Sequence, residues 1–191
     1  WLTVPVTYRF PQKINEVKIN NHNRWRKKHH QALLTNYRRA PYYKNFTALL
    51  ERVYGDDWEY LSDLNIFLTE ALRRHLGISR PVFRASDLDL NNEDPTGRLI
   101  DICRALHADT YLAGAGGENY MDLKQFRDNN INVLIQDFHH PTYPQQFGRF
   151  ISQLSSIDFL LNCGPTSISE ALSANAEKQP EEKATPNHLP D

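Results

Sequence analysis

The feature that most limits how this chain can fold is an alternation of strand-like and helix-like segments in its middle third. Strand and helix patterns follow one another over residues 81–85, 94–108, 109–114, 122–130 and 131–138. The first of these helices has a clear start, because Asp94 is a capping residue and Pro95 stands at the first helical position. Strands that alternate with helices of this size pair in parallel through right-handed crossovers. We therefore expect an α/β fold in three layers, with helices on both faces of a mainly parallel sheet.

A helical region at about residues 23–76 precedes this alternation, and we expect it to pack on the sheet or beside it. Apolar residues recur at helical spacing over 23–41, 43–54 and 61–76, and Gly77 supplies a C-terminal cap for the last of these. Two short strand-like runs, 1–6 and 16–19, come earlier. Helices are also predicted at 151–162, where Gly164 and Pro165 follow, and at 167–172.

The composition suits one globular domain. With 191 residues, of which 40% are apolar, residues 1–174 are long enough for a single core, and the polar tail 175–191 is predicted to be disordered. The longest apolar runs are far too short for a bilayer core of roughly 30 Å, and nothing in the sequence resembles a signal peptide, so a cytoplasmic protein is expected. Cys103 and Cys163 form no metal or disulfide pattern and are expected to be reduced.

The positive charge is concentrated in one segment. The net charge is −1, yet the run from His22 to Tyr43 has six Lys or Arg, three His and no carboxylate. On a helix these cations share a face, and two interpretations stay open. The face lies beside the acidic segment 51–63, or it forms a wall for a phosphorylated or carboxylated ligand. Nucleic acid ranks lower, because the chain has little net charge and no second basic stripe.

Ligands of open parallel sheets bind beyond the carboxyl ends of the strands, which selects two segments here. The strand at 109–114 leads into Gly114, Gly116 and Gly117, which let a backbone approach an anion closely. Their spacing matches no nucleotide motif, and a tight turn explains them equally well. The strand at 131–138 leads into the densest group of neutral donors and acceptors in the chain: His139, His140, Tyr143 and Gln145.

Histidine exchanges a proton near pH 7, so this second segment is a candidate for catalysis. Its histidines could equally bond a carbonyl or pack under a loop, and Asp137 could orient an imidazole or face solvent. No second set of ligands at metal spacing accompanies the paired histidines, so no metal site is predicted, and the cofactor is left unknown. Cys163 is a poor nucleophile candidate, because the end of a helix disfavours a thiolate.

Five runs of the sequence together resemble the WbqC-like protein family of bacteria: 23–43, 58–68, 96–122, 136–145 and 155–165. The resemblance extends from Trp1 to about Ala174. Members of that family are often encoded with genes for O-antigen and other surface polysaccharides, which implies a role in making or decorating a sugar precursor. Similar proteins also begin earlier, with a strand and helix that carry a His-Gln-Pro-like run, so we expect this chain to lack an N-terminal segment.

The resemblance further implies a shared pocket formed by Trp25, Arg26, Lys28, His29, Thr96, Arg98, Gly114, Gly116, Gly117, Tyr120, His140, Tyr143 and Gln145. We predict His140, His29 and Tyr143 to be catalytic, and the remaining residues, with Arg24 and His139, to bind the ligand.

The expected function is a transferase or amide-forming enzyme acting on a nucleotide-linked amino sugar. The alternatives are a non-catalytic module that binds a sugar nucleotide or a partner protein and, third, nucleic-acid binding through the basic helix. No membrane insertion is expected, and the oligomeric state is left open.

Overall fold

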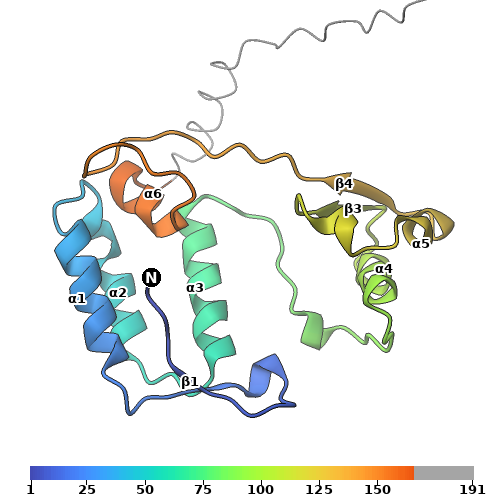
Figure 1. Ribbon diagram of the computed structural model, residues 1–191, viewed down its shortest axis with the longest axis horizontal. Helices are drawn as coiled ribbons and strands as arrows, with labels where there is room; N and C mark the ends of the chain where they lie inside the picture. The colour runs from blue at the N-terminus through green and yellow to red at the C-terminus, as the bar shows by residue number, and fades with distance from the viewer. Residues whose placement is uncertain (166–191) are drawn as a thin grey trace, which may run out of the picture. The chain divides into compact units, whose positions relative to one another are not determined.

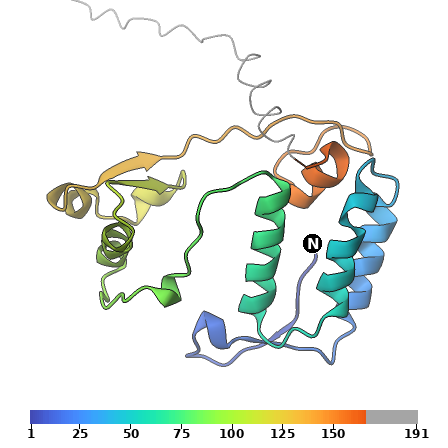
Figure 2. The ribbon, with the colours of Figure 1, turned by 180° about the vertical axis from the view of Figure 1, so that it is seen from behind.

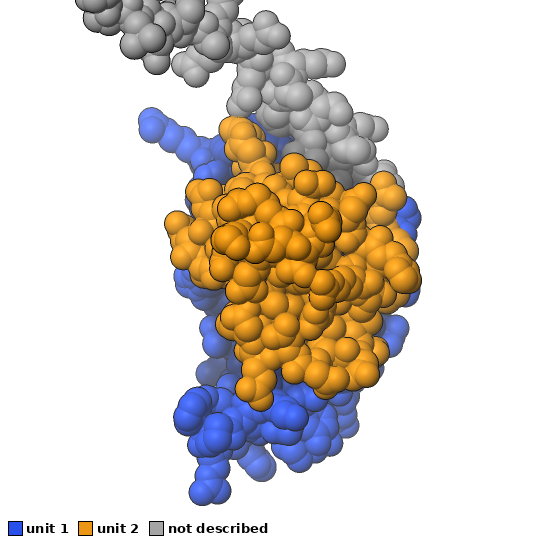
Figure 3. Space-filling model, turned by 90° about the vertical axis from the view of Figure 1, so that its right-hand side faces the viewer, with its two compact units in different colours: residues 1–79, 140–191 blue, residues 80–139 orange. Residues whose placement is uncertain are grey.

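A computed structural model describes residues Trp1–Pro165, which form two compact units (Figure 3). Unit 1 comprises Trp1–Ser79 and the described residues from His140 onward, and unit 2 comprises Arg80–His139. The helix predicted at 167–172 and the disordered tail predicted at 175–191 lie outside the described residues. The single domain expected over residues 1–174 stays a prediction.

Unit 1 is mainly helical (Figure 1, Figure 2). Its α-helices are α1 (Trp25–Tyr37), α2 (Thr47–Gly55), α3 (Leu61–His75) and α6 (Ser156–Cys163). Two short strands, β1 (Val6–Thr7) and β2 (Lys18–Ile19), pair antiparallel, and single 3-10 turns lie at η1 (Ile14–Glu16) and η2 (Tyr43–Phe46). The three helices predicted between residues 23 and 76 are therefore confirmed.

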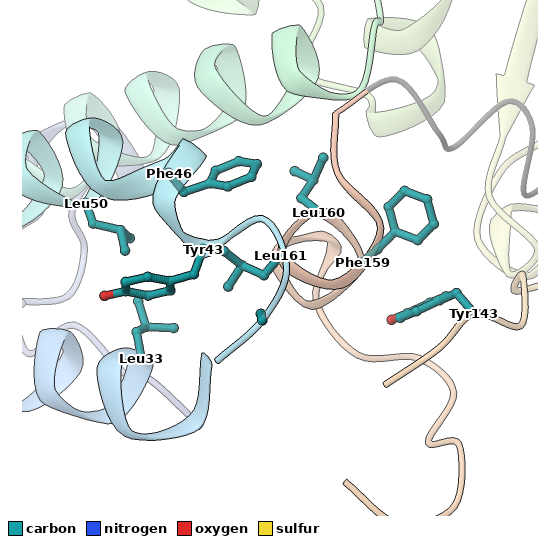
Figure 4. Packing of buried hydrophobic residues seen from close by; sticks show 9 residues of the cluster. Leu33, Tyr43, Phe46, Leu50, Tyr143, Phe159, Leu160 and Leu161 are labelled. Atoms are coloured by element: carbon teal, nitrogen blue, oxygen red, sulfur yellow. The ribbon is translucent and has the colours of Figure 1, made fainter. Parts of the chain in front are cut away.

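Two apolar clusters hold unit 1 together. In the first, Phe46 and the α6 residues Leu160 and Leu161 are fully buried beside Leu33 and Leu50 (Figure 4). The second cluster joins β2, α1, α2 and α3 through one buried residue of each: Ile19, Trp25, Val53 and Leu64. Val4 of the N-terminal segment packs against this cluster. Helix α6 buries five consecutive residues, Asp158–Asn162, of which the middle three are apolar.

Unit 2 contains η3 (Ala85–Asp87), α4 (Pro95–Ala105), β3 (Thr110–Ala113), η4 (Gly117–Asn119), α5 (Leu123–Asp128) and β4 (Asn132–Ile135). Strands β3 and β4 are parallel, in a register that pairs Thr110 with Asn132. The predicted start of α4 is confirmed, because the Asp94 carboxylate accepts a hydrogen bond from the Gly97 amide at 2.6 Å. Ile100, Cys103 and Phe126 form the centre of the core.

Helices and strands are mixed, broadly as in an α/β protein, but three layers around a mainly parallel sheet are not confirmed. The described residues hold six α-helices and two sheets of two strands each. The strand expected at 81–85 is wrong: Val82 and Phe83 are 55% and 59% exposed, and strands persist where a neighbouring element covers their side chains. Helix α6 begins at Ser156 rather than at 151, after Ser155 as its cap.

None of the helices between Trp1 and Pro165 combines the length and the apolar character that a membrane crossing requires.

Candidate functional site

A buried carboxylate, Asp158, organises the region around the predicted catalytic loop. It lies in the first turn of α6 and is only 5% exposed. Its Oδ1 accepts a hydrogen bond from the Tyr37 hydroxyl at 2.8 Å. Its Oδ2 accepts one from the Tyr143 hydroxyl at 2.8 Å and one from Gln145 Nε2 at 3.1 Å. Both carboxylate oxygens are therefore satisfied by neutral donors, which joins α1, α6 and the loop after His140.

The loop that follows His140 is fastened at two further points. Gln145 Nε2 also donates to the Ile151 carbonyl at 2.9 Å, and Gln145 Oε1 accepts from the Ile151 amide at 2.8 Å. The buried ring of Tyr143 packs edge-on against Phe150 and against Phe159, whose place beside it is visible in Figure 4. This part of the loop therefore has a defined shape.

The tyrosine hydroxyls in this network act as donors. Burial, reinforced by the hydrogen bond to Asp158, raises the pKa of Tyr143 to about 12. The same two causes, in the same order, raise the pKa of Tyr37. Both hydroxyls therefore keep their protons at neutral pH, and Tyr143, one of the predicted catalytic residues, uses its proton to hold Asp158.

His140 lies against this network. Its ring centroid is 6.0 Å from those of Tyr143 and Phe150. Its Nδ1 is 2.9 Å from the Pro141 carbonyl oxygen, so the predicted alternative of a carbonyl partner is found. Because a carbonyl oxygen only accepts, Nδ1 carries a hydrogen, and Nε2 has the lone pair of the neutral ring. The neighbouring His139 belongs to unit 2, is exposed, and has its Nδ1 3.8 Å from Asp137 Oδ1.

The first turns of α1 place two predicted site residues in the core. Trp25 and His29 are buried, and their rings contact each other and the Tyr54 ring edge-on. His29 Nε2 is 3.1 Å from the Thr3 carbonyl oxygen, which makes Nε2 the protonated nitrogen. Burial lowers the pKa of His29, and the hydrogen bond to Thr3 opposes this only in part. His29 is therefore neutral at pH 7.

Arg26 differs from its neighbours. Its Nε and Nη2 are shielded from solvent, and neither has a hydrogen-bond partner among the described residues. These two nitrogens form one edge of the guanidinium. Such an edge can donate two parallel hydrogen bonds to a carboxylate or a phosphate. The guanidinium lies over the Trp25 ring, 5.1 Å from its centroid, and Nη2 is 3.8 Å from the exposed Asp57. Arg24 and Lys28, by contrast, are exposed on α1.

The remaining predicted residues lie in unit 2. Thr96 is buried, and its hydroxyl oxygen accepts from the Asp122 amide at 3.1 Å, whereas Arg98 and Tyr120 are exposed. Gly117 has a packing reason: a Cβ there would lie 2.8 Å from the Ala113 Cβ and 2.9 Å from the Met121 Cε. Nothing lies within 4 Å of a Cβ built on Gly114, and Gly116 has comparable room. That these residues share a pocket with those of unit 1 stays a prediction.

Two further features bear on ligand sites. In unit 2 a surface hollow of about 460 Å³ lies between α5 and β4, and it includes none of the predicted residues. Over Trp1–Pro165, no three His, Cys, Asp or Glu side chains gather as metal ligands would.

The sequence did not lead us to Asp158, although Asp158 accepts hydrogen bonds from two predicted site residues, Tyr143 and Gln145. The signal was available, because Asp158 is the one carboxylate in an otherwise apolar run, with Ile157 before it and Phe159 after it. A charged residue within such a run is buried with its helix and needs donors.

Comparison with known proteins agrees with the resemblance seen in the sequence. The chain is 33% identical over 168 residues to an uncharacterized protein of Mycobacterium tuberculosis (strain ATCC 25618 / H37Rv), a match that covers 86% of this chain and 72% of the relative. No solved structure matches. The model of the WbqC-like protein family matches residues 1–170. The chain therefore belongs to the WbqC-like protein family.

Proposed function

We propose that this protein is an enzyme of bacterial surface-polysaccharide biosynthesis, a transferase or amide-forming catalyst that acts on a nucleotide-linked amino sugar. The observation that carries the proposal is the guanidinium of Arg26, which has two buried nitrogens without a hydrogen-bond partner among the described residues. Membership of the WbqC-like family supports the class of pathway.

Arg26 supplies the anchor for an anionic group of the ligand. Leaving a buried donor unsatisfied costs about 1–3 kcal/mol, and more when the group is charged. A phosphate or carboxylate at the Nε and Nη2 edge would recover this free energy through two charge-assisted hydrogen bonds. The Asp57 carboxylate is too weak a competitor, because it is fully exposed and 3.8 Å away.

His140 supplies the base. With its Nδ1 hydrogen directed at the Pro141 carbonyl, the lone pair of Nε2 can take a proton from an attacking amine or hydroxyl. Tyr143 and Gln145 have a different role in this proposal, because their donors are directed at Asp158. His29 packs against the ring of Trp25, over which the Arg26 guanidinium lies.

A non-catalytic module that binds a sugar nucleotide is the second candidate. It is favoured by one observation: two of the three predicted catalytic side chains, His29 and Tyr143, are buried and hydrogen-bonded within unit 1.

Ligand binding and turnover, measured on matched variants, test the proposal. UDP-N-acetylglucosamine and UDP serve as probes in thermal-shift assays of the wild type, Arg26→Met and the control Arg39→Met, which changes an exposed arginine near the end of α1. A ligand at a hundredfold excess over its Kd stabilises the folded state by about 2.7 kcal/mol. We expect that stabilisation in the wild type and the control and its loss in Arg26→Met. Equal stabilisation of all three would refute the role of Arg26.

Catalysis is tested separately, by mass spectrometry of UDP-glucosamine, whose amino group is free to be acylated, incubated with acyl and aminoacyl donors. The His140→Gln variant should bind the probe as the wild type does and should not consume it. A wild type that binds the probe but consumes none of it with any donor would favour the binding module.

A further inference from the structure

We propose that Asp158 is a positioning residue: through Tyr143 and Gln145 it sets the place of the His140 ring. The importance of that place rests on the proposed function, whereas the chain of contacts from Asp158 to His140 stands on the structure alone.

The first step is the cost of burying Asp158. A carboxylate loses several kcal/mol of hydration on burial, and apolar replacements for buried charges are often as stable. An apolar cluster in place of Asp158 and its donors together could therefore be equally stable. Instead the chain surrounds Asp158 with donors, and the backbone carbonyl of the same residue accepts from Asn162 Nδ2 at 2.8 Å. A carboxylate whose oxygens all have hydrogen-bond donors holds the donor side chains in defined positions, and apolar packing does this less precisely.

The second step is that the two oxygens of Asp158 serve different elements. Oδ1 faces α1 through Tyr37, which joins two helices of the core. Oδ2 accepts both hydrogen bonds from the loop, those of Tyr143 and Gln145. An oxygen that accepts two donors at once needs a carbonyl or carboxylate, so no hydrophobic side chain could replace it here.

The third step leads from Oδ2 to His140. Gln145 fastens the loop at Ile151 by two hydrogen bonds, which places Phe150 next to the ring of Tyr143. The His140 ring rests against Tyr143 and Phe150. Pro141 holds the backbone of His140 in an extended conformation, and its carbonyl oxygen is 2.9 Å from His140 Nδ1. The rings of Tyr143 and Phe150 act together with this contact in placing the imidazole.

A pair of tyrosine variants tests this inference. Tyr143→Phe and Tyr37→Phe each remove one hydroxyl whose oxygen is 2.8 Å from the same carboxylate and keep the ring. Tyr37→Phe should cost at least as much stability, because Oδ2 keeps the hydrogen bond from Gln145 when the Tyr143 hydroxyl is removed. Only Tyr143, however, leads to His140. The readouts are the NMR signal of the His140 Cε1 proton at a fixed pH and the acylation of UDP-glucosamine.

We expect Tyr143→Phe to shift the His140 signal and to lower kcat by about tenfold with KM little changed, the size of effect that a small misplacement of a base produces. Tyr37→Phe should leave both unchanged, and Asp158→Asn, which keeps an oxygen acceptor, should retain the His140 signal. Equal shifts in both tyrosine variants, or none in Tyr143→Phe, would overturn the inference. A shifted signal in a protein without turnover would support the positioning and refute the proposed function.

Discussion

Unit 1 shields charged atoms of two side chains from solvent in opposite ways. Asp158, at the start of α6, accepts hydrogen bonds from three side chains that come from α1 and the loop after His140. Arg26, at the start of α1, has two shielded nitrogens without a hydrogen-bond partner among residues 1–165. The charge of Asp158 supports the fold, because its removal would leave the donor groups around it without an acceptor. The charge of Arg26 lowers the stability of the fold, because its shielded donors lack acceptors. Such a group is expected where a ligand supplies the acceptor.

The largest effect is expected from Asp158→Ala. This change leaves the hydroxyls of Tyr37 and Tyr143 without their acceptor, and the Gln145 amide keeps only the Ile151 carbonyl. We expect the free energy of unfolding in urea to fall by about 3–5 kcal/mol, as when one partner of a buried polar network is removed. Asp158→Asn is the control and should lose about 1–2 kcal/mol, because one oxygen acceptor remains. An alanine variant as stable as the wild type would remove the contrast between the two charges.

A much smaller effect, with the opposite sign, is expected from Arg26→Met. Methionine keeps the apolar stem and removes the unpartnered donors, so the free energy of unfolding should stay equal or rise by about 1 kcal/mol. Arg39→Met, on an exposed side chain, should change stability by no more than about 0.5 kcal/mol. A clear loss of stability in Arg26→Met, measured in the absence of ligand, would show that Arg26 also supports the fold.

A third effect is the dependence of stability on pH that comes from His29. Burial lowers its pKa in the folded state, so the unfolded chain binds the proton more tightly. The contribution of His29 is therefore complete above its unfolded pKa of about 6.5 and is lost as the pH falls below it. Urea denaturation at several pH values should show a weaker loss of stability on acidification in His29→Gln. An unchanged profile would mean that the pKa of His29 does not differ between the folded and the unfolded chain.

The smallest effect is expected from Asp57→Asn. The carboxylate of Asp57 is fully exposed and 3.8 Å from Arg26 Nη2, so water and salt screen the attraction. We expect no measurable change in the free energy of unfolding at low or at high salt. A salt-dependent loss of stability would identify Asp57 as the true partner of Arg26 and would weaken the case for a ligand there.

The elements that sequence reasoning predicted well are those with local signals. Asp94 with Pro95 fixed the start of α4, and Gly77, at φ +71°, follows the end of α3 as predicted. The strand expected at 81–85 was predicted from its apolar residues alone, and such residues do not show whether a partner strand exists. Gly117 was selected as an anion contact, but its neighbours Ala113 and Met121 already require a glycine.

The candidate site was predicted only in part, for a related reason. His140, Tyr143 and Gln145 are close in sequence, and the structure brings the last two together at Asp158. The residue that joins them to α1 was missed, because Tyr37 and Asp158 are 121 positions apart and no local pattern links them. The orphaned nitrogens of Arg26 depend on the packing around one side chain, which the spacing of residues does not encode.

The separation of unit 1 into two stretches of sequence has a consequence for synthesis on the ribosome. Leu33 and Phe46 are made early, but Leu160 and Leu161, which complete their cluster, are made after all of unit 2. Until then the apolar faces of α1 and α2 lack that cover, while unit 2 can fold from one continuous stretch. The nascent chain therefore depends longest on chaperones at its first helices, and a stop codon placed before α6 should yield an aggregating product.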